Sequence, residues 1–302
     1  MTYSSNGIAY LAGVLSTLAL CAIPAAAYSW GDEGHEVIGL IADHYLEPAV
    51  RTKVIAILAG DATHLTPTTQ MDSEATWADK YRDSDRNTTK VNYSRTRNWH
   101  FVDLELQAPD LKAACFGRPP LPKETPASAG PANDCVVDKI DEFAAELKQS
   151  TTSETEKRFA LQFILHLVGD VHQPLHASDD QDRGGNLKTV TAPGIASNNL
   201  HHDWDTEFVS VLGPNAAAIA QQLIANITNA QRSQWEMGTA ADWAAETFAV
   251  AKEHSYGLLP ATDQPNHYQL SAAYVSDAAT VTQQQLSKAG VRLAFVLNQA
   301  LR

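Results

Sequence analysis

The sequence predicts an all-α fold, a single helical bundle domain with long loops and one short β-hairpin. Two observations support this prediction. Apolar residues recur at intervals of three and four positions in several long segments, which is the pattern of helices that bury one face. Strand-like sequence bounded by turn residues occurs in only one short segment. The helices are therefore expected to form the core.

Two of the predicted helices have defined ends. The first begins at Glu33 and ends before Pro48, and its buried face is formed by Val37, Ile38, Ile41, Ala42 and Tyr45. The second begins at Ser153, where Glu156 three positions later completes a capping box, and it ends before Pro174. Its apolar face is formed by Phe159, Phe163, Ile164, Leu167 and Val168.

The rest of the chain supplies three more predicted helices and the hairpin. The helical segments have alanine-rich faces and run from Ala216 to Asn229, Asp242 to Lys252 and Val275 to Leu301. The hairpin is predicted at Leu187 to Ile195, which is flanked by Gly184-Gly185 and Pro193-Gly194.

The composition limits the class of protein. The chain has 302 residues, 44% of them hydrophobic, and a net charge of −13. It can therefore bury a substantial core. Binding to duplex DNA depends largely on basic residues that displace counterions, so this acidic balance argues against a groove-reading regulator. There is no internal repeat or low-complexity run, and one large domain is expected.

The N-terminus has the pattern of a signal peptide. An apolar stretch from Ile8 to Ala27 is followed by Ala27-Tyr28-Ser29, which resembles a signal-peptidase site, so cleavage is predicted after Ser29. Residues 1–29 would be the signal peptide and residues 30–302 the mature domain, secreted or periplasmic and without a membrane segment. Because no Lys or Arg precedes the stretch, a transmembrane anchor is an alternative. A lipoprotein signal at Cys21 fits less well, because Leu20 is not small.

Two cysteines remain in the mature chain, Cys115 and Cys135. In an exported protein they are expected to form a disulfide that closes a loop rich in Pro, Gly and Ser. The alternative is two free thiols.

Two clusters of histidine and aspartate indicate metal binding. His166 and Asp170 are four residues apart on the predicted capped helix, so both project from one face and can hold one divalent ion. His201 and Asp205 have the same spacing. The alternative for either pair is a solvated polar helix face. His172, His202 and Asp203 lie in the same two clusters, but they are interpreted as bystanders or packing residues.

The predicted mature N-terminus is a third candidate. Cleavage after Ser29 places the free α-amine of Trp30 five residues before His35. A free amine together with its own carbonyl oxygen can chelate zinc. Taken alone, His35 fits an ordinary packed or exposed helical histidine better than a metal ligand.

These pieces fall in the order of a known family. The motifs are W-G-x-x-G-H from Trp30, W-A-D-x-x-R from Trp77, W-H-F-V-D from Trp99, H-L-V-G-D-V-H-Q-P-L-H from His166, G-G-N from Gly184 and N-L-H-x-x-W-D from Asn199. Together they closely resemble the secreted tri-zinc nucleases of fungi and plants, the single-strand-specific nucleases and 3'-nucleotidases. The resemblance continues to A-G-V-R-L-A at Ala289 to Ala294.

The resemblance implies three Zn²⁺ ions in a cleft, held by nine residues. The first ion would be bound by Asp79, His100, His166 and Asp170, the second by Trp30, His35 and the shared Asp170, and the third by His176, His201 and Asp205. These ligands are carboxylates and imidazoles without a thiolate, as in catalytic zinc sites that keep a position for water.

The resemblance also implies substrate contacts. Arg82 could clamp a phosphate oxygen or orient Asp103, and Asp103 could steer the attacking water. Their alternative is a structural ion pair. Phe101 would stack on a nucleobase, and its alternative is a core phenylalanine.

The implied function is zinc-dependent hydrolysis of single-stranded RNA or DNA to 5'-mononucleotides, with 3'-nucleotidase activity and no stable protein partner. The zinc ions would activate water, neutralise phosphate charge and assist the leaving oxygen. The alternatives are a zinc phospholipase C-like phosphodiesterase and a non-catalytic exported zinc-binding protein.

Overall fold

The computed structural model describes Met1 and residues 30–302. The predicted signal peptide and the two alternatives to it, an anchor and a lipoprotein signal, lie outside the described residues. Within the described part of the chain, no helix combines the length and the apolar character needed to cross a membrane.

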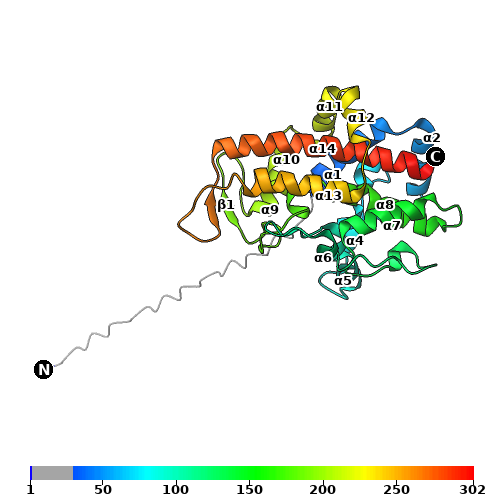
Figure 1. Cartoon of the computed structure of the whole chain (residues 1–302), viewed down its shortest axis with the longest axis horizontal. Coiled ribbons are helices and arrows are strands. Elements are labelled where there is room, and N and C mark those ends of the chain that lie inside the picture. The colour runs from blue at the N-terminus through cyan, green and yellow to red at the C-terminus, as the bar shows by residue number, and fades with distance from the viewer. Residues whose placement is uncertain (2–29) are drawn as a thin grey trace.

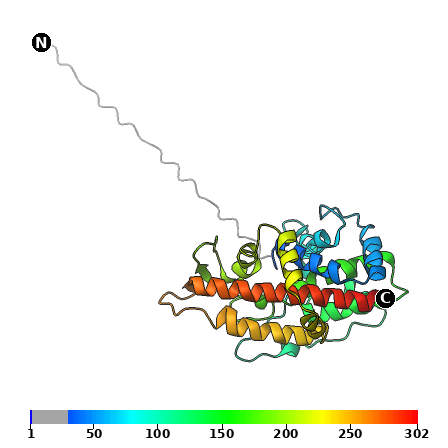
Figure 2. The same ribbon diagram turned by 90° about the horizontal axis from the view of Figure 1, so that it is seen from above.

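Four long helices form the centre of the molecule: α1 (Asp32–Tyr45), α7 (Val136–Lys148), α8 (Glu154–Asp170) and α14 (Ala272–Leu301). Helix α14 extends along most of the long dimension of the folded part formed by residues 30–302 (Figure 1). It packs on α1 and α8, and α7 packs beside α8. Figure 2 shows α14 lying between the blue N-terminal helices on one side and the orange helix α13 on the other. The predicted all-α fold is confirmed.

Shorter elements surround this centre. The α-helices are α2 (Pro48–Leu58), α3 (Met71–Glu74), α4 (Trp77–Asp83), α5 (Val91–Thr96), α6 (Leu111–Ala114), α9 (Leu200–His202), α10 (Phe208–Ser210), α11 (Ala216–Asn226), α12 (Asn229–Trp235) and α13 (Ala240–Val250). Three 3₁₀ turns, η1 (Arg97–His100), η2 (Ala127–Ala129) and η3 (Pro174–His176), and two π-helical turns, η4 (Asp203–Glu207) and η5 (Ala251–Tyr256), complete the helical part.

The local chemistry at the helix ends agrees with the prediction in part. The Ser153 hydroxyl accepts a hydrogen bond from the backbone N–H of Glu156, 3.2 Å away, and caps α8, but the Glu156 side chain does not make the return bond of the predicted capping box. Helix α1 ends at Tyr45, and Pro48 is the first residue of α2. Proline is well suited to that position, because its missing N–H would have no partner inside the helix.

The predicted hairpin at Leu187 to Ile195 is wrong. Its first half forms strand β1 (Thr189–Thr191), but β1 pairs in parallel with the distant strand β2 (His267–Gln269). The chain does turn back after β1, yet only the single antiparallel bridge between Thr189 and Asn199 results. Strand β1 therefore pairs with a strand that is remote in sequence, whereas the turn residues beside it predict pairing with the adjacent segment.

An aromatic cluster forms the part of the core beneath the site described below. The rings of Phe143 and Phe163 stack with their centroids 5.2 Å apart, and Trp99 packs edge-on against Phe163 at 5.3 Å. All three side chains are fully buried. The ring of His100 lies 6.3 Å from that of Phe163. The core thus holds the residue after Trp99 in a fixed place.

The predicted disulfide between Cys115 and Cys135 is present, and the alternative of two free thiols is wrong. It connects the end of α6 to the residue that precedes α7. The loop between the two cysteines has only one short 3₁₀ turn, η2, so the covalent link holds a segment with little core of its own.

We expect the double substitution Cys115→Ser and Cys135→Ser to lower the free energy of unfolding by about 3 kcal/mol, because the bond closes a loop of 20 residues and restricts the unfolded chain. Urea denaturation measures the change, and the reduced wild-type protein is the control. Equal denaturation midpoints for the oxidised wild type and the double variant would contradict this account.

Candidate metal centre and active site

Buried histidine and aspartate side chains gather in three groups, two of which share His166. In each group one ligand atom per residue lies within 4.8 Å of the others. The groups are Asp79, His100 and His166; His35, His166 and Asp170; and His176, His201 and Asp205. Eight of the nine predicted zinc ligands are therefore brought together in the arrangement that the sequence predicts.

The first group joins three separate parts of the chain. Helix α4 supplies Asp79, the turn η1 supplies His100 and helix α8 supplies His166. The Oδ1 atom of Asp79 lies 3.3 Å from Nδ1 of His100 and 3.4 Å from Nε2 of His166. Their lone pairs can converge on one ion.

Asp170 connects this group to the second. Its Oδ2 atom lies 3.0 Å from Nδ1 of His100 and 3.3 Å from Nε2 of His166, on the preceding turn of α8. Its Oδ1 atom lies 3.4 Å from Nε2 of His35, on α1. The two oxygens of one carboxylate thus face two different sets of imidazoles, as a ligand shared between two ions requires.

The third group forms where the chain turns after α8. The Nε2 atom of His201 lies 3.3 Å from Oδ2 of Asp205, and Nε2 of His176 lies 3.8 Å from Oδ1 of the same residue. The side-chain amide of Gln173 donates a hydrogen bond to Oδ1 of Asp205. Sequence reasoning missed Gln173, although it lies inside the motif that begins at His166.

Trp30 lies between the second and third groups. Its side chain is fully buried, and its indole Nε1 donates to the carbonyl oxygen of Gly169, 3.0 Å away and directly before Asp170 in the chain. The backbone N–H of Gly31 donates to the carbonyl oxygen of Asp205 at 2.8 Å. The first residue of the predicted mature chain is therefore held next to both groups.

Backbone carbonyls orient three of the imidazoles. The Nδ1 atom of His166 lies 2.8 Å from the oxygen of Ala75, that of His176 lies 2.8 Å from the oxygen of His100, and that of His201 lies 2.6 Å from the oxygen of Gly184. A carbonyl accepts only, so each Nδ1 carries the proton and each Nε2 presents its lone pair to the group. Metal-binding histidines are typically oriented in this way.

The carboxylates of these groups have strongly shifted pKa values. Burial opposes ionisation of Asp79, but Arg82 and the imidazoles of His166 and His100 hold its pKa well below the ordinary value. Burial raises the pKa of Asp205 well above the ordinary value, and the amide donor of Gln173 opposes this only in part. Burial thus favours the protonated acid of Asp205, whereas a bound divalent ion would stabilise its carboxylate form.

Unsatisfied atoms test whether metal ions fit these residues. Within the described residues, Nε2 of His176, Oδ1 of Asp170 and Oδ2 of Asp205 are buried and have no hydrogen-bond partner. Buried polar atoms without partners are rare in folded proteins, because each costs free energy. Here all three atoms face the groups, and the donor set of imidazole nitrogens and carboxylate oxygens suits Zn²⁺.

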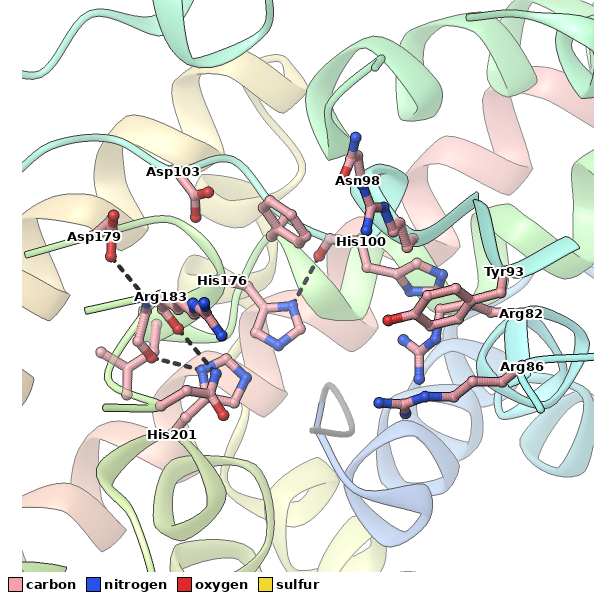
Figure 3. A pocket seen from close by; sticks show the side chains of 15 residues that line it. Arg82, Arg86, Tyr93, Asn98, His100, Asp103, His176, Asp179, Arg183 and His201 are labelled. Carbon is pink, nitrogen blue, oxygen red and sulfur yellow. Dashed lines mark hydrogen bonds between the residues drawn. The ribbon is translucent and has the colours of Figure 1, made fainter. Parts of the chain in front are cut away.

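Three of the candidate ligands, His100, His176 and His201, line a cavity of about 460 Å³. Figure 3 shows two walls that face each other across His176, with Arg82, Arg86 and Tyr93 on one and Asp103 and Asp179 on the other. The predicted residues Arg82, Phe101 and Asp103 all line this cavity. Other lining residues were missed by sequence reasoning, among them Arg86, Tyr93, Arg97, Asp179 and Arg183, although Arg86 follows Arg82 by only four positions.

Arg82 is engaged by two carboxylates. Its NH1 atom donates to Oδ1 of Asp79 at 2.6 Å, and its Nε and NH2 atoms donate to the two oxygens of Asp83 at 3.0 and 2.9 Å. The guanidinium therefore fixes a metal ligand, and it lies on the opposite wall from Asp103 rather than orienting it (Figure 3).

Asp103 has a different environment. Partial enclosure at the cavity wall, where the residue itself remains exposed, and the negative charges of Asp179, Glu105 and Asp182 raise its pKa to about 7. The carboxyl group can therefore hold or release a proton near neutral pH, which suits a group that handles the proton of an attacking water.

The histidines and the aspartate interpreted as bystanders lie outside the three groups. The Nδ1 atom of His172 faces the carbonyl oxygen of Val168 at 2.7 Å, and its Nε2 accepts from Arg292 at 2.8 Å. His202 is half-exposed, and its Nε2 lies 3.5 Å from Glu207. Asp203 accepts hydrogen bonds from Ser197 and the backbone of Asn198.

The order and content of these groups agree with one family of enzymes. The family model described as S1/P1 Nuclease matches residues 30–302. The chain belongs to the S1/P1 nuclease family. It is accordingly a nuclease, a hydrolase of phosphodiester bonds.

Individual members of the S1/P1 nuclease family align over nearly the whole chain. Nuclease S1 of Aspergillus oryzae is 28% identical over 302 residues, covering 94% of each chain. Nuclease P1 of Penicillium citrinum is 28% identical over 296 residues, covering 89% of this chain and 97% of its own. Endonuclease 2 of Arabidopsis thaliana is 27% identical over 290 residues, covering 90% of each.

We expect Gly184→Ala to weaken metal binding by this nuclease about ten- to a hundredfold, because the carbonyl of Gly184 orients His201. Gly184 has a left-handed φ of +58°, and an added Cβ would lie 2.4 Å from the carbonyl oxygen of Leu175, so the loop must move. Competition with a chromophoric zinc chelator measures the affinity.

The matched control is Gly194→Ala. Gly194 has a φ of +82°, so alanine is strained there too, but an added Cβ meets nothing within 4 Å. Equal metal affinity in the two variants would mean that the Gly184 carbonyl does not orient His201.

Proposed function

We propose that this nuclease is a zinc-dependent phosphodiesterase that hydrolyses single-stranded RNA and DNA to 5'-mononucleotides and also acts on 3'-nucleotides. The observation that carries the proposal is the position of Asp170, whose two oxygens face His35 on one side and His100 and His166 on the other. One carboxylate shared in this way indicates neighbouring ions that act on the same phosphate.

The proposed site holds three Zn²⁺ ions. The first would be held by Asp79, His100, His166 and Asp170, the second by Trp30, His35 and Asp170, and the third by His176, His201 and Asp205. When bound, the ions would lower the pKa of a water molecule, neutralise charge on the phosphate and assist the departing 3'-oxygen.

The protein side chains have separate roles in this proposal. Arg82 keeps Asp79 ionised and fixed through the 2.6 Å contact, so it acts as a positioning residue for the metal set. Asp103, with its pKa raised to about 7, accepts the proton of the attacking water. Phe101, half-buried at the cavity wall, stacks on a nucleobase, and stacking tolerates every base.

The recessed position of the ligands favours flexible strands. The imidazoles of His100 and His176 are nearly fully buried at the cavity floor, so a phosphate must enter the cavity to approach them. A single strand can bend its backbone inward, whereas a stiff duplex cannot. The basic residues of the cavity wall also act locally in a chain with a net charge of −13.

Export completes the proposed site. Cleavage after Ser29 would free the α-amine of Trp30 next to Asp170 and Asp205, where Trp30 is already held. The start of the family match at residue 30 supports this boundary, and the mature chain would be secreted or periplasmic as one domain of residues 30–302.

We expect the zinc-loaded protein to hydrolyse a single-stranded oligonucleotide more than about tenfold faster than the same sequence in a duplex. Salt must be matched, because binding to nucleic acid depends strongly on it. Release of mononucleotides, followed by chromatography, measures both rates. Equal rates would contradict the conclusion that the buried position of the ligands excludes a duplex. Hydrolysis of phosphatidylcholine without hydrolysis of RNA would favour a phospholipase.

We expect His201→Asn to reduce bound zinc from about three ions to about two per chain, with loss of nuclease activity, because a three-residue site loses a ligand. His202→Asn is the matched control, since His202 is the next residue in the chain but is half-exposed and paired with Glu207. Elemental analysis gives the zinc content. If His201→Asn bound as much zinc and cleaved RNA as fast as the control, the third zinc site would not exist. A wild-type protein that binds three zinc ions but has no nuclease activity would favour a zinc-binding protein.

A further inference from the structure

One segment contributes three of the four arginines that line the cavity. Between Asp79 and His100 the chain places Arg82, Arg86, Tyr93 and Arg97 at the cavity lining. Arg82 and Arg86 come from the end of α4 and the turn after it, and Tyr93 comes from α5. The assigned ligands of the metal set lie at the two ends of this segment, and the roles given above leave Arg86, Tyr93 and Arg97 without a function.

Arg86 keeps its charge and its donors available. The side chain of Arg82 is 8% exposed and is engaged by two carboxylates, whereas the side chain of Arg86 is 36% exposed. The ion pair that Arg86 makes within residues 30–302 is a 3.8 Å approach to Oδ2 of Asp83. That oxygen already accepts from Arg82 at 2.9 Å, so it compensates Arg86 only weakly.

Tyr93 holds the Arg86 side chain in place. The guanidinium carbon of Arg86 lies 5.1 Å above the centroid of the Tyr93 ring, which is a cation–π distance. Figure 3 shows both side chains on the wall opposite Asp103 and Asp179. An arginine stacked on an aromatic ring keeps its planar edge free for a bidentate contact with phosphate.

Asp85 fixes the backbone that carries this pair. Its Oδ1 accepts from the N–H of Tyr93 at 3.1 Å, and its Oδ2 accepts from the N–H of Asn92 at 3.0 Å. The Thr89 hydroxyl also donates to Oδ2, at 2.7 Å. The turn between Arg86 and Tyr93 is therefore closed by one carboxylate, so the two side chains are built on a fixed frame rather than on a loose surface loop.

The charge of the two walls determines what can lie against each. Arg97 adds a third guanidinium to the basic side and makes no ion pair within the described chain. Asp103 and Asp179 face Arg82 and Arg86 across the cavity, and Arg183 lies on the side of the two aspartates (Figure 3). That side therefore carries mixed charge, whereas Arg82 and Arg86 stand on the other side without a facing carboxylate among the labelled residues of their own wall. A strand that places its scissile phosphate at the metal groups finds the more favourable surface for a further phosphate on the side of Arg86.

We propose that Arg86, stacked on Tyr93 and assisted by Arg97, binds a backbone phosphate of a single strand other than the phosphate being hydrolysed. The inference rests on the proposed function and adds a substrate class to it: strands with at least two phosphodiesters. Such a contact lengthens the recognised substrate beyond one nucleotide on either side of the cleaved bond.

The test compares Arg86→Ala with wild type on two substrates of one base, a dinucleoside monophosphate and a trinucleoside diphosphate. The first has only the scissile phosphate, so it cannot use the Arg86 contact while being cleaved. We expect the ratio of kcat/KM for the longer over the shorter substrate to fall about tenfold in Arg86→Ala, as for loss of a charge-assisted hydrogen bond.

Salt dependence provides a second readout. On a single-stranded oligonucleotide, log kcat/KM should fall with log salt concentration less steeply in Arg86→Ala than in wild type, by about 0.7 in the slope, because one phosphate contact is lost. Arg86→Lys should keep most of the wild-type slope. The matched control is Arg95→Ala, which removes the same charge from an exposed position on the same helix as Tyr93 but does not line the cavity.

The outcomes separate the two levels of the proposal. An Arg86→Ala protein with the wild-type substrate ratio, or an Arg95→Ala protein with the same loss of slope, would overturn the phosphate subsite and leave the nuclease assignment standing. A wild-type, zinc-loaded protein that cleaves neither short substrate nor single-stranded RNA would overturn the proposed function itself.

Discussion

The structure depends on one buried carboxylate. Asp170 is fully buried, yet burial does not neutralise it, because His166, His100, His35 and His176 together hold its pKa well below the ordinary value. A carboxylate in such a place is stable only while its partners stay in position. Those partners come from α1, α8 and the turns η1 and η3, so these elements must pack correctly around a single side chain. Asp170 therefore stays ionised only when the helices and turns that carry these imidazoles are correctly packed.

The backbone, more than other side chains, sets the geometry around that carboxylate. Carbonyl oxygens of Ala75, His100 and Gly184 each fix one imidazole, and none of these interactions depends on the identity of a side chain. The aromatic cluster beneath His100 then limits how far the turn η1 can move. Orientation is thus determined by the path of the chain, which explains why a precise site can be assembled from segments more than one hundred residues apart in sequence, such as α1 and α8.

Sequence reasoning recovered what is local or periodic. The helical core, the Ser153 cap and the spacing of His166 with Asp170 follow from repeats of three and four residues, and the structure contains all of them. It failed for β1, whose partner lies in a remote segment that no local pattern identifies. It also missed Gln173, which donates a hydrogen bond to Asp205, and Arg86, which lines the cavity. Both roles depend on residues that are distant in sequence and meet only in the folded chain. The resemblance to a family assigned ligands, but the carbonyls that orient them are invisible in side-chain motifs.

The floor and the walls of the cavity have different origins, and this limits how such an enzyme can diversify. The floor consists of side chains whose positions the core helices and their backbone carbonyls determine, so a change there alters folding and metal binding together. The part of the basic wall that carries Arg86 and Tyr93 is a short excursion between α4 and η1, closed by Asp85 and largely separate from the core. Variation in that excursion can alter which polymers are accepted while the hydrolytic apparatus stays intact. Substitutions in this segment can therefore change the length of substrate that is preferred while the metal ligands and the hydrolytic reaction stay the same.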